Sequence, residues 1–258
     1  MTNNLNEQTA LITGASSGIG KATAEILAKQ GIKLILLARR EALLKELQAD
    51  LSPLTKCHIV ACDINNHGKL LQALADLPNE FKQIDILINN AGLALGLNPA
   101  HETDWIDWQT MINTNCLSLA FLTRQILPGL VKRNHGHIIN IGSIAGSYAY
   151  KGANVYGATK AFVEQFSSNL RSDLLGTAIR VTNVEPGMLN ESEFSLVRFK
   201  GNQEQANDVY SGLEPLRSED IAETIRWILA QPAHININNI EIMPIHQALA
   251  GPTTVKNL

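Results

Sequence analysis

Short, largely apolar runs alternate with helical patterns along almost the whole chain. Residues 9–13 and 33–38 are two such runs, and helical periodicity follows at 19–30 and 41–51. Unbroken apolar runs are typical of strands that are covered on both faces of a parallel sheet. The alternation therefore predicts a doubly wound α/β fold with helices on both faces. The expected strands cover 9–13, 33–38, 57–61, 84–88, 137–142, 178–184 and 238–243, and the expected helices cover 19–30, 41–51, 67–77, 105–132, 154–175 and 218–230.

Composition excludes several classes of function. The chain has 258 residues, 45% of them hydrophobic, and a net charge of −3. The composition is that of an ordinary globular protein, and the charge does not indicate a nucleic-acid partner. No apolar run reaches the roughly 18 residues that a membrane span needs, and the polar start does not resemble a signal peptide. The three cysteines are odd in number and lack CxxC spacing, so we expect neither a disulfide framework nor a metal site, and a cytoplasmic location.

No linker or internal repeat divides the chain, so we expect one domain over residues 1–258. Within it, Pro186-Gly187 opens a long stretch without a clear helical or strand pattern. Long loops of this kind in compact domains are often functional. We therefore predict that residues 187–215 form a substrate lid.

Tyr156 and Lys160 are four residues apart in an expected helix, so both side chains lie on one face. A phenol has a pKa of about 10, which an ammonium group at ~4 Å can lower toward about 7. Such a phenol can exchange a proton with a substrate hydroxyl, and Ser143 can hold the same oxygen. The alternative is a surface Tyr and Lys that share a helix face by chance.

A glycine-rich loop follows the first strand and precedes a helix. Its spacing, Gly14-x-x-x-Gly18-x-Gly20, differs from the common GxGxxG fingerprint but follows the same physical logic. Small residues let the backbone approach a pyrophosphate, and the helix offers free N–H groups and the positive end of its dipole. The alternative is a tight turn that needs glycine for its conformation only.

Arg39 and Arg40 stand where a dinucleotide site places its ribose selector, about twenty residues past the glycine loop. A carboxylate at this position holds the 2′-hydroxyl of NAD, whereas an arginine accommodates the 2′-phosphate of NADP. No carboxylate ends the second strand, since Glu41 begins the next helix. NADP(H) is therefore the expected cofactor, and a solvated arginine pair is the alternative.

Two further motifs follow strands at the edge where ligands bind in this architecture. Asp63-Ile64 comes after the third strand, and Asp63 is predicted either to accept from an adenine amino group or to cap a helix. Asn89-Asn90-Ala91-Gly92 ends the fourth strand. Its amides are expected to hold the fold together and to contact the cofactor ribose.

Together these motifs resemble the classical short-chain dehydrogenase/reductase family, and the resemblance covers essentially the whole chain. Finer features resemble a branch of NADP-dependent enzymes that act on 3-hydroxy acids and also oxidise serine and L-allo-threonine. The motifs that carry the family resemblance are Thr13-Gly-Ala-Ser-Ser-Gly-Ile-Gly20, Asn89-Asn-Ala-Gly92, Asn115, Ser143, Tyr156-x-x-x-Lys160 and Pro186-Gly187. Stretches such as Asn134-His-Gly-His-Ile-Ile-Asn-Ile-Gly142 and Glu193-Phe-Ser-Leu-Val-Arg-Phe-Lys-Gly201 carry the resemblance to the branch.

The resemblance implies a single-domain, Rossmann-like fold with a seven-stranded parallel sheet, and a homotetramer. It implies that Tyr156 is the general base or acid, that Lys160 lowers its pKa, that Ser143 orients the substrate oxygen and that Asn115 holds a water in a proton relay. The residues expected to bind NADP are Gly14, Ser16, Ser17, Gly18, Ile19, Gly20, Arg39, Arg40, Asp63, Ile64, Asn90, Ala91, Gly92, Tyr156, Lys160, Pro186 and Gly187.

A hydroxy-acid substrate carries a carboxylate, so the lid should offer a cation. Arg198 is the first candidate and Lys200 the second, while Met188 and Leu189 are expected to form an apolar wall. Glu191 adds a carboxylate at the start of the lid and departs from the branch pattern. Two alternatives stay open: a broad carbonyl or ketone reductase on the same scaffold, and a non-catalytic NADP-binding sensor.

Overall fold

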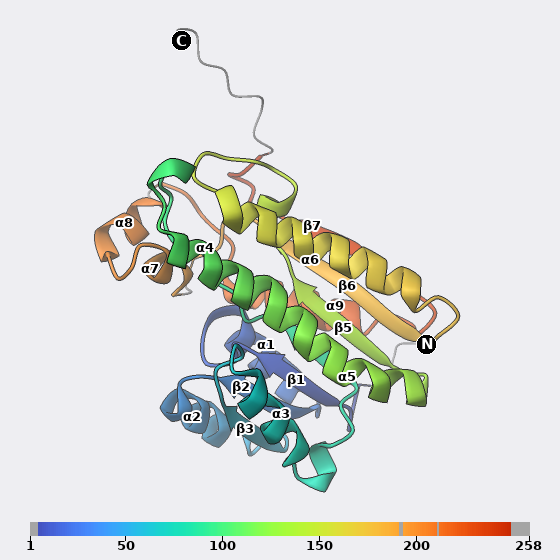
Figure 1. The fold of residues 1–258 in the computed structure, drawn as a ribbon. Coiled ribbons are helices and arrows are strands. Elements are labelled where there is room, and N and C mark those ends of the chain that lie inside the picture. Colours follow the sequence, from blue (N-terminus) through green and yellow to red (C-terminus); the bar gives the residue numbers. More distant parts are fainter. Residues whose placement is uncertain (1–4, 191–192, 211, 249–258) are drawn as a thin grey trace, which may run out of the picture.

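The computed structural model describes residues 5–190, 193–210 and 212–248, and Figure 1 shows one sheet between two layers of helices. In this part of the chain, seven strands form an all-parallel sheet in the order β3-β2-β1-β4-β5-β6-β7. The chain runs outward from β1 to β3, returns to the centre, and runs outward again from β4 to β7. This is the doubly wound order, so the predicted fold class is confirmed, and its switch point lies between β1 and β4.

The described elements have the following bounds. The strands are β1 (Thr9–Thr13), β2 (Lys33–Ala38), β3 (Cys57–Ala61), β4 (Ile86–Asn89), β5 (Gly136–Ile141), β6 (Ile179–Pro186) and β7 (Asn239–Ile242). The α-helices are α1 (Gly18–Ala28), α2 (Glu41–Leu51), α3 (His67–Ala75), α4 (Trp105–Ile112), α5 (Leu119–Arg133), α6 (Asn154–Asp173), α7 (Phe194–Arg198), α8 (Gln203–Asp208) and α9 (Ser218–Leu229). Between them lie the 3-10 helices η1 (Asn79–Phe81), η2 (Ala100–Glu102) and η4 (Ile144–Gly146), and the π-helix η3 (Asn113–Ser118).

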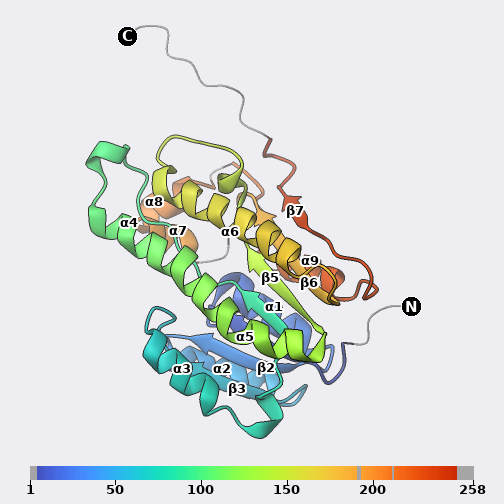
Figure 2. The ribbon, with the colours of Figure 1, turned by 45° about the vertical axis from the view of Figure 1, so that its right-hand side comes forward.

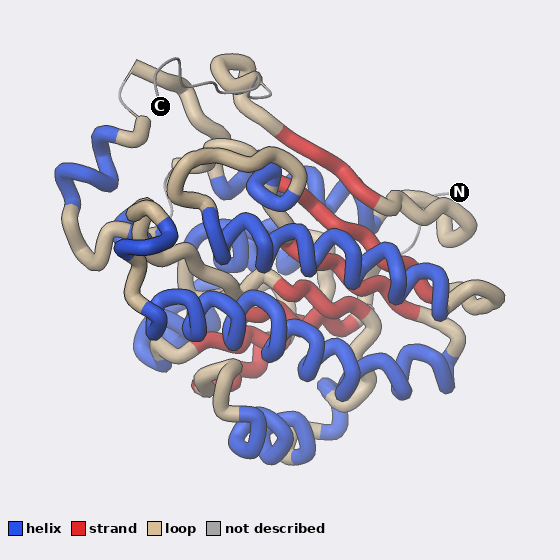
Figure 3. The backbone as a smooth tube through the Cα atoms, turned by 45° about the horizontal axis from the view of Figure 1, so that its top comes forward, coloured by secondary structure: helices blue, strands red, loops and turns tan. Residues whose placement is uncertain are grey.

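The two faces of the sheet carry separate apolar cores. Side chains alternate along a strand, so Leu11 of β1 packs into one core while its neighbours Ala10 and Ile12 pack into the other. Helices α1, α2 and α9 cover the face of Ala10, and α3, α5 and α6 cover the face of Leu11. The layers can be followed in Figures 2 and 3. Burial on both faces explains why the strands read as unbroken apolar runs.

The long helix expected over 105–132 is interrupted. Helix α4 passes into the π-helix η3 at Asn113 and continues as α5 from Leu119. A π segment accommodates one extra residue in the turn and often occurs at functional sites. Apolar periodicity alone does not reveal it, because the pattern continues across both flanking helices.

Several other boundaries differ from the prediction by one or two residues. Strand β4, for example, begins at Ile86 rather than at residue 84, and the Asp85 carboxylate before it accepts a hydrogen bond from the Thr9 amide at 3.1 Å. The stretch 187–215 was expected to be irregular, yet it contains the short helices α7 and α8. Both views place these helices next to α4 (Figures 1 and 2).

The described residues contain neither a membrane-spanning helix nor a cluster of metal ligands. In that part of the chain, no helix has the length and apolarity that crossing a membrane requires. The same residues contain no group of three or more His, Cys, Asp or Glu side chains arranged to hold a metal ion.

Candidate active site

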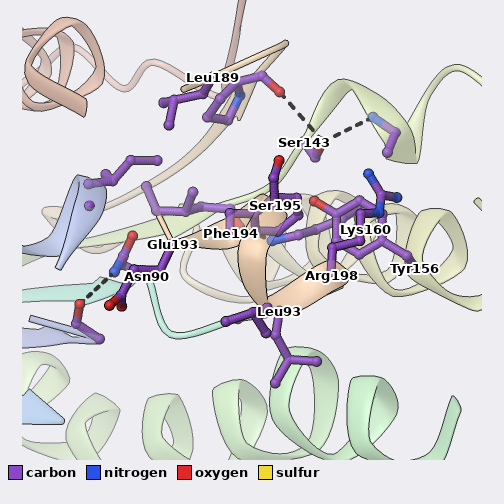
Figure 4. A pocket seen from close by; sticks show the side chains of 18 of the residues that line it. Asn90, Leu93, Ser143, Tyr156, Lys160, Leu189, Glu193, Phe194, Ser195 and Arg198 are labelled. Atoms are coloured by element: carbon purple, nitrogen blue, oxygen red, sulfur yellow. Dashed lines mark hydrogen bonds between the residues drawn. The ribbon is translucent and has the colours of Figure 1, made fainter. Parts of the chain in front are cut away.

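A cleft of about 710 Å³ opens at the carboxyl edge of the sheet. Its walls include the glycine loop, the Arg39-Arg40 pair, the ends of β4 and β5, Tyr156 and Lys160 of α6, and the segment that leads into α7. In open α/β sheets, ligands bind at this edge beside the switch point. Residues that are far apart in the sequence thus meet in one site (Figure 4).

The glycine loop is packed tightly against Asn90. The Asn90 side-chain amide donates to the Thr13 carbonyl at 2.9 Å and to the Gly14 carbonyl at 3.3 Å. Gly14 has a φ of +67°, and a Cβ there would stand 2.8 Å from the Asn90 amide nitrogen. At Gly20, a Cβ would stand 2.3 Å from the Gly14 carbonyl oxygen. The loop's own geometry therefore requires glycine at both positions. This agrees with the alternative interpretation, in which the glycines are needed for the conformation of the turn.

The same loop also leaves the start of α1 available to a ligand. Ser17 is the N-cap residue, but its side chain makes no capping hydrogen bond, and the first turn holds no acidic residue. Backbone N–H groups at such an end favour an anion. Since this end of α1 lines the cleft, the arrangement fits a pyrophosphate group.

Arg40 is anchored at the rim of the cleft by three side chains. Its guanidinium donates to the Ser16 hydroxyl at 3.0 Å and to the Ser17 hydroxyl at 2.9 Å. It also pairs with Glu193 at 2.7 Å. Arg39 lines the same rim and is exposed. Both predicted arginines therefore lie at the cleft, and Arg40, although exposed, is part of a charged network.

The two strand-end motifs have distinct roles. Asp63 lines the cleft, and its carboxylate accepts from the Asn65 amide at 2.9 Å. It does not cap α3, because Asn66 does so by accepting from Lys69. The expected capping role of Asp63 is therefore wrong.

Asn89 and Asn90 hold neighbouring segments together. The Asn89 amide donates to the Thr123 hydroxyl at 2.9 Å and to the Asn140 oxygen at 2.8 Å, and so joins β4 to α5 and β5. Asn90 ties the same strand end to the glycine loop. The structural half of the Asn-Asn-Ala-Gly prediction is confirmed, while contact of Ala91 and Gly92 with a cofactor stays a prediction.

Ser143, Tyr156 and Lys160 form one cluster in the cleft (Figure 4). Ser143 follows β5, and its side chain hydrogen-bonds Tyr156 of α6. The Lys160 ammonium donates to the Ile141 carbonyl at 2.8 Å and lies 5.9 Å from the centre of the Tyr156 ring. Tyr156 and Lys160 are each 7% exposed. A chance pairing on a solvated helix face is therefore excluded.

The sequence predicts that Lys160 lowers the pKa of Tyr156. In this arrangement the prediction is wrong, because the pKa is raised. Burial raises the pKa of Tyr156 to about 12, and only the Ser143 hydrogen bond and the Arg198 guanidinium act to lower it. Burial also lowers the pKa of Lys160 to about 8. The helix spacing correctly places the two side chains together. However, it does not show that both are withdrawn from water and that the ammonium is directed to the Ile141 carbonyl.

Asn115 lies in the π-helix and is 2% exposed. Its side chain exchanges two hydrogen bonds with the backbone of Leu93, at 2.9 and 2.8 Å, and donates to the Thr159 hydroxyl at 3.0 Å. Thr159 lies between Tyr156 and Lys160 in α6. Asn115 thus fixes the loop after β4 relative to the catalytic helix, while its water-holding role stays a prediction.

Arg198 is brought to the cluster by α7. Its guanidinium donates to the Tyr150 hydroxyl at 2.6 Å, and its central carbon lies 5.3 Å from the centre of the Tyr156 ring. Its backbone carbonyl also accepts from the Gly96 amide at 2.8 Å. Lys200 instead pairs with Asp107 of α4 at 2.8 Å and does not line the cleft. The second candidate for binding a carboxylate is therefore wrong.

The apolar wall of the cleft is larger than the sequence indicated. Met188 and Leu189 line it, as predicted. The Phe194 ring also packs at 5.7 Å from the Tyr156 ring, measured between centres. Phe194, Tyr150 and Glu193 are among the lining residues that sequence reasoning missed, because no motif spacing connects them to Tyr156 and Lys160 of α6. Glu191 lies outside the described residues.

Comparison with known proteins agrees with this geometry. The NADP-dependent 3-hydroxy acid dehydrogenase YdfG of Escherichia coli (strain K12) is 51% identical over 241 residues, 93% of this chain and 96% of that protein. Serine 3-dehydrogenase of Rhizobium radiobacter is 51% identical over 243 residues, 94% of this chain and 96% of that protein. A solved structure of the closed form of serine dehydrogenase complexed with NADP+ has a TM-score of 0.94 and 49% identity, and the match covers 97% of this chain and 100% of that one.

The fold and the cleft define a Rossmann-like α/β oxidoreductase, with a glycine loop and a Ser-Tyr-Lys cluster at one sheet edge. The short chain dehydrogenase family model matches residues 8–200. The chain belongs to the short-chain dehydrogenase family.

Proposed function

We propose that the protein is an NADP(H)-dependent dehydrogenase that interconverts 3-hydroxy acids with their 3-oxo acids or semialdehydes. Serine, L-allo-threonine and 3-hydroxypropionate represent the substrate class. The observation that carries the proposal is the position of Arg198, whose guanidinium carbon lies 5.3 Å from the centre of the Tyr156 ring. A cation beside the proton-transfer group suits a substrate that carries both a hydroxyl and a carboxylate.

The cofactor would be held by the glycine loop and by the two arginines. The open start of α1 supplies N–H donors for the pyrophosphate, and Arg39 and Arg40 supply guanidinium groups for the 2′-phosphate. Asp63 is placed to contact the adenine, and Lys160 the nicotinamide ribose. Once bound, NADP(H) supplies the hydride chemistry, and the protein supplies orientation and proton transfer.

Tyr156 and Ser143 act on the substrate oxygen. With a pKa of about 12, Tyr156 is protonated at neutral pH, so it is ready to donate a proton to an oxo oxygen during reduction. In the oxidative direction Tyr156 first loses its own proton to solvent through a water that Asn115 holds, and the resulting phenolate then accepts the hydroxyl proton. The Ser143 hydroxyl orients the substrate oxygen because it already hydrogen-bonds Tyr156.

Arg198 binds the substrate carboxylate and Met188 lies against the carbon chain. Tyr150 orients the arginine by accepting a hydrogen bond from it at 2.6 Å. Residues 187–215 act as the lid that brings Arg198 to the cleft. Its start passes over the apolar wall, and α7 carries Phe194 and Arg198 on one short turn of helix.

The protein works as a homotetramer in the cytoplasm. Support for assembly comes from large apolar side chains that are exposed along α4, η3, α5 and α6, such as Ile112, Leu117, Val131 and Phe162. Support for a reducing compartment comes from the three cysteines, which are free.

A substrate panel tests this function. Serine, L-allo-threonine, 3-hydroxypropionate and 3-hydroxyisobutyrate are each assayed with NADP+ and with NAD+ at 340 nm. The expected result is turnover of at least one hydroxy acid, with kcat/KM at least about tenfold higher with NADP+, since one charge-assisted contact is worth about 1.5 kcal/mol or more. Equal values with the two cofactors would remove the arginine pair from cofactor selection.

A broad carbonyl reductase is the second candidate, because Leu93, Met188, Leu189 and Phe194 give the cleft a large apolar wall. The two functions differ in their need for a substrate carboxylate. A methyl ester of the best 3-hydroxy acid separates them: the proposed dehydrogenase loses most of its kcat/KM on the ester, and a broad reductase keeps it.

A further inference from the structure

The Glu193 carboxylate accepts hydrogen bonds from Arg40 and Ser17, the same donors that are proposed to bind the phosphate of the cofactor. Its oxygens lie 2.7 Å from the Arg40 guanidinium, and the Ser17 side chain also hydrogen-bonds it. Glu193 belongs to the lid and stands directly before α7, whereas Arg40 and Ser17 belong to the nucleotide half of the fold. The contact therefore joins two regions that are 153 positions apart in the chain.

Each of the three guanidinium nitrogens of Arg40 is engaged in this network. Its Nη1 donates to Glu193, its Nε to Ser16, and its Nη2 to both Ser16 and Ser17. Carboxylate and phosphate oxygens accept from the same donor geometry, and a guanidinium binds either as a fork. A 2′-phosphate at Arg40 must therefore share or replace the Glu193 contact, and the two anions repel each other at that range.

We propose that Glu193 is a specificity-determining residue, which competes with the 2′-phosphate of NADP(H) for Arg40 and Ser17 and thereby weakens binding of the phosphorylated cofactor. The Arg40 and Glu193 side chains are 42% and 48% exposed, so the ion pair is weak and a phosphate dianion can displace it. NAD(H) has a ribose hydroxyl at this position and leaves the ion pair in place.

This inference rests on the proposed NADP dependence and concerns binding rather than turnover. Isothermal titration calorimetry measures the Kd of NADP+, NAD+, 2′,5′-ADP and 5′-AMP on the wild-type protein, Glu193→Gln and Glu193→Ala. Glu204→Gln is the matched control, because Glu204 is an exposed carboxylate on α8 of the same lid and does not line the cleft. The two adenosine phosphates isolate the phosphate contact from the nicotinamide.

The expected result is that both Glu193 variants bind NADP+ and 2′,5′-ADP about three- to fivefold more tightly, as an exposed ion pair allows. NAD+, 5′-AMP and the Glu204 variant stay within about twofold of the wild type. Weaker NADP+ binding would overturn the proposal, because Glu193 would then hold Arg40 in place for the phosphate. Equal changes for NADP+ and NAD+ would overturn it too. If wild-type protein fails to prefer NADP+ over NAD+, the proposed function falls together with the inference.

Discussion

The catalytic cluster and the lid face each other across one cleft but are held by different kinds of contact. Tyr156 and Lys160 are nearly buried, and Lys160 is tied to the backbone of β5. The lid is held by backbone hydrogen bonds, such as that from the Gly96 amide to the Arg198 carbonyl, and by ion pairs with exposed partners, such as Glu193 with Arg40 and Lys200 with Asp107. Buried, hydrogen-bonded groups are costly to disturb, whereas exposed pairs contribute little.

This difference suggests that proton transfer and substrate selection are assigned to separate parts of the protein, the cluster and the lid. The cluster rests on a sheet and a 20-residue helix, so its geometry is set by the core. The lid rests on helices of five and six residues, and the substrate contact proposed for it is Arg198. Related proteins can therefore keep the same proton-transfer site and change what reaches it by altering a few exposed residues.

The largest expected effect comes from Tyr156→Phe. Loss of the proton-transfer group should lower kcat by about 10³-fold, within the usual range for general acid–base catalysis. NADP+ binding by calorimetry should stay within a few-fold of the wild type, because the cofactor contacts assigned to the glycine loop and the arginines are unchanged. Retained turnover would show that Tyr156 does not transfer the proton. The chemistry would then not depend on the buried cluster in the way proposed.

Lys160 should make a contribution to stability that rises with pH. Its pKa is about 8 in the fold against 10.5 for an ordinary lysine, so the unfolded chain binds more protons between these values. Unfolding free energy therefore increases from about pH 8 to 10.5, by up to about 3 kcal/mol from this group. Urea unfolding of the wild type and Lys160→Met at pH 8 and pH 9.5 measures the slope.

The Lys160→Met variant should lose this rise, whereas Lys132→Met, at an exposed position on α5, should keep it. Tyr156 contributes with the opposite sign, but only above about pH 10, because its folded pKa is raised to about 12. The measurements at pH 8 and pH 9.5 stay below that range. Burial raises the pKa of Cys57 and of Cys116 from 9.0 to about 11, so both cysteines lower stability from about pH 9 upward. The contribution of Lys160 is therefore the difference in slope between the wild type and Lys160→Met. An equal slope in Lys160→Met and the wild type would show that Lys160 is not held away from water.

An intermediate effect is expected at Arg198→Ala. Removing a charge-assisted contact worth about 1.5–3 kcal/mol should raise KM for 3-hydroxy acids by about tenfold or more. KM for a neutral secondary alcohol should change much less. Steady-state kinetics with both substrates measure the difference. Equal increases would mean that Arg198 supports the lid through Tyr150 and Gly96 without binding the carboxylate.

The smallest effect is expected at Lys200→Ala. This residue pairs with Asp107 at an exposed position, where such a contact contributes about 0–1 kcal/mol. KM for hydroxy acids should change by less than about fivefold, and kcat should be nearly unchanged. An increase in KM as large as that of Arg198→Ala would place Lys200 in the substrate site. Arg198 and Lys200 would then no longer differ in role.

Local pattern was sufficient for most of the fold. The apolar runs predicted the seven strands within a few residues, because strands buried on both faces need continuous apolar sequence. The local sequence pattern did not reveal the π-helix around Asn115 or the two short helices of the lid. An inserted residue in a helical turn leaves the apolar periodicity on both sides intact, and five-residue helices carry too little periodicity to detect.

At the candidate site, the sequence by itself determined which residues meet on one element. Helix spacing placed Tyr156 with Lys160, whereas the packing of the glycine loop against Asn90 came from the order of the strands in the structure. Only the tertiary structure decided the environment of these groups. Burial raises the pKa of Tyr156, and packing across the sheet edge joins Glu193 to Arg40 and Arg198 to Tyr150. Both effects depend on contacts between segments about 50 to 150 positions apart, which local periodicity and spacing do not encode.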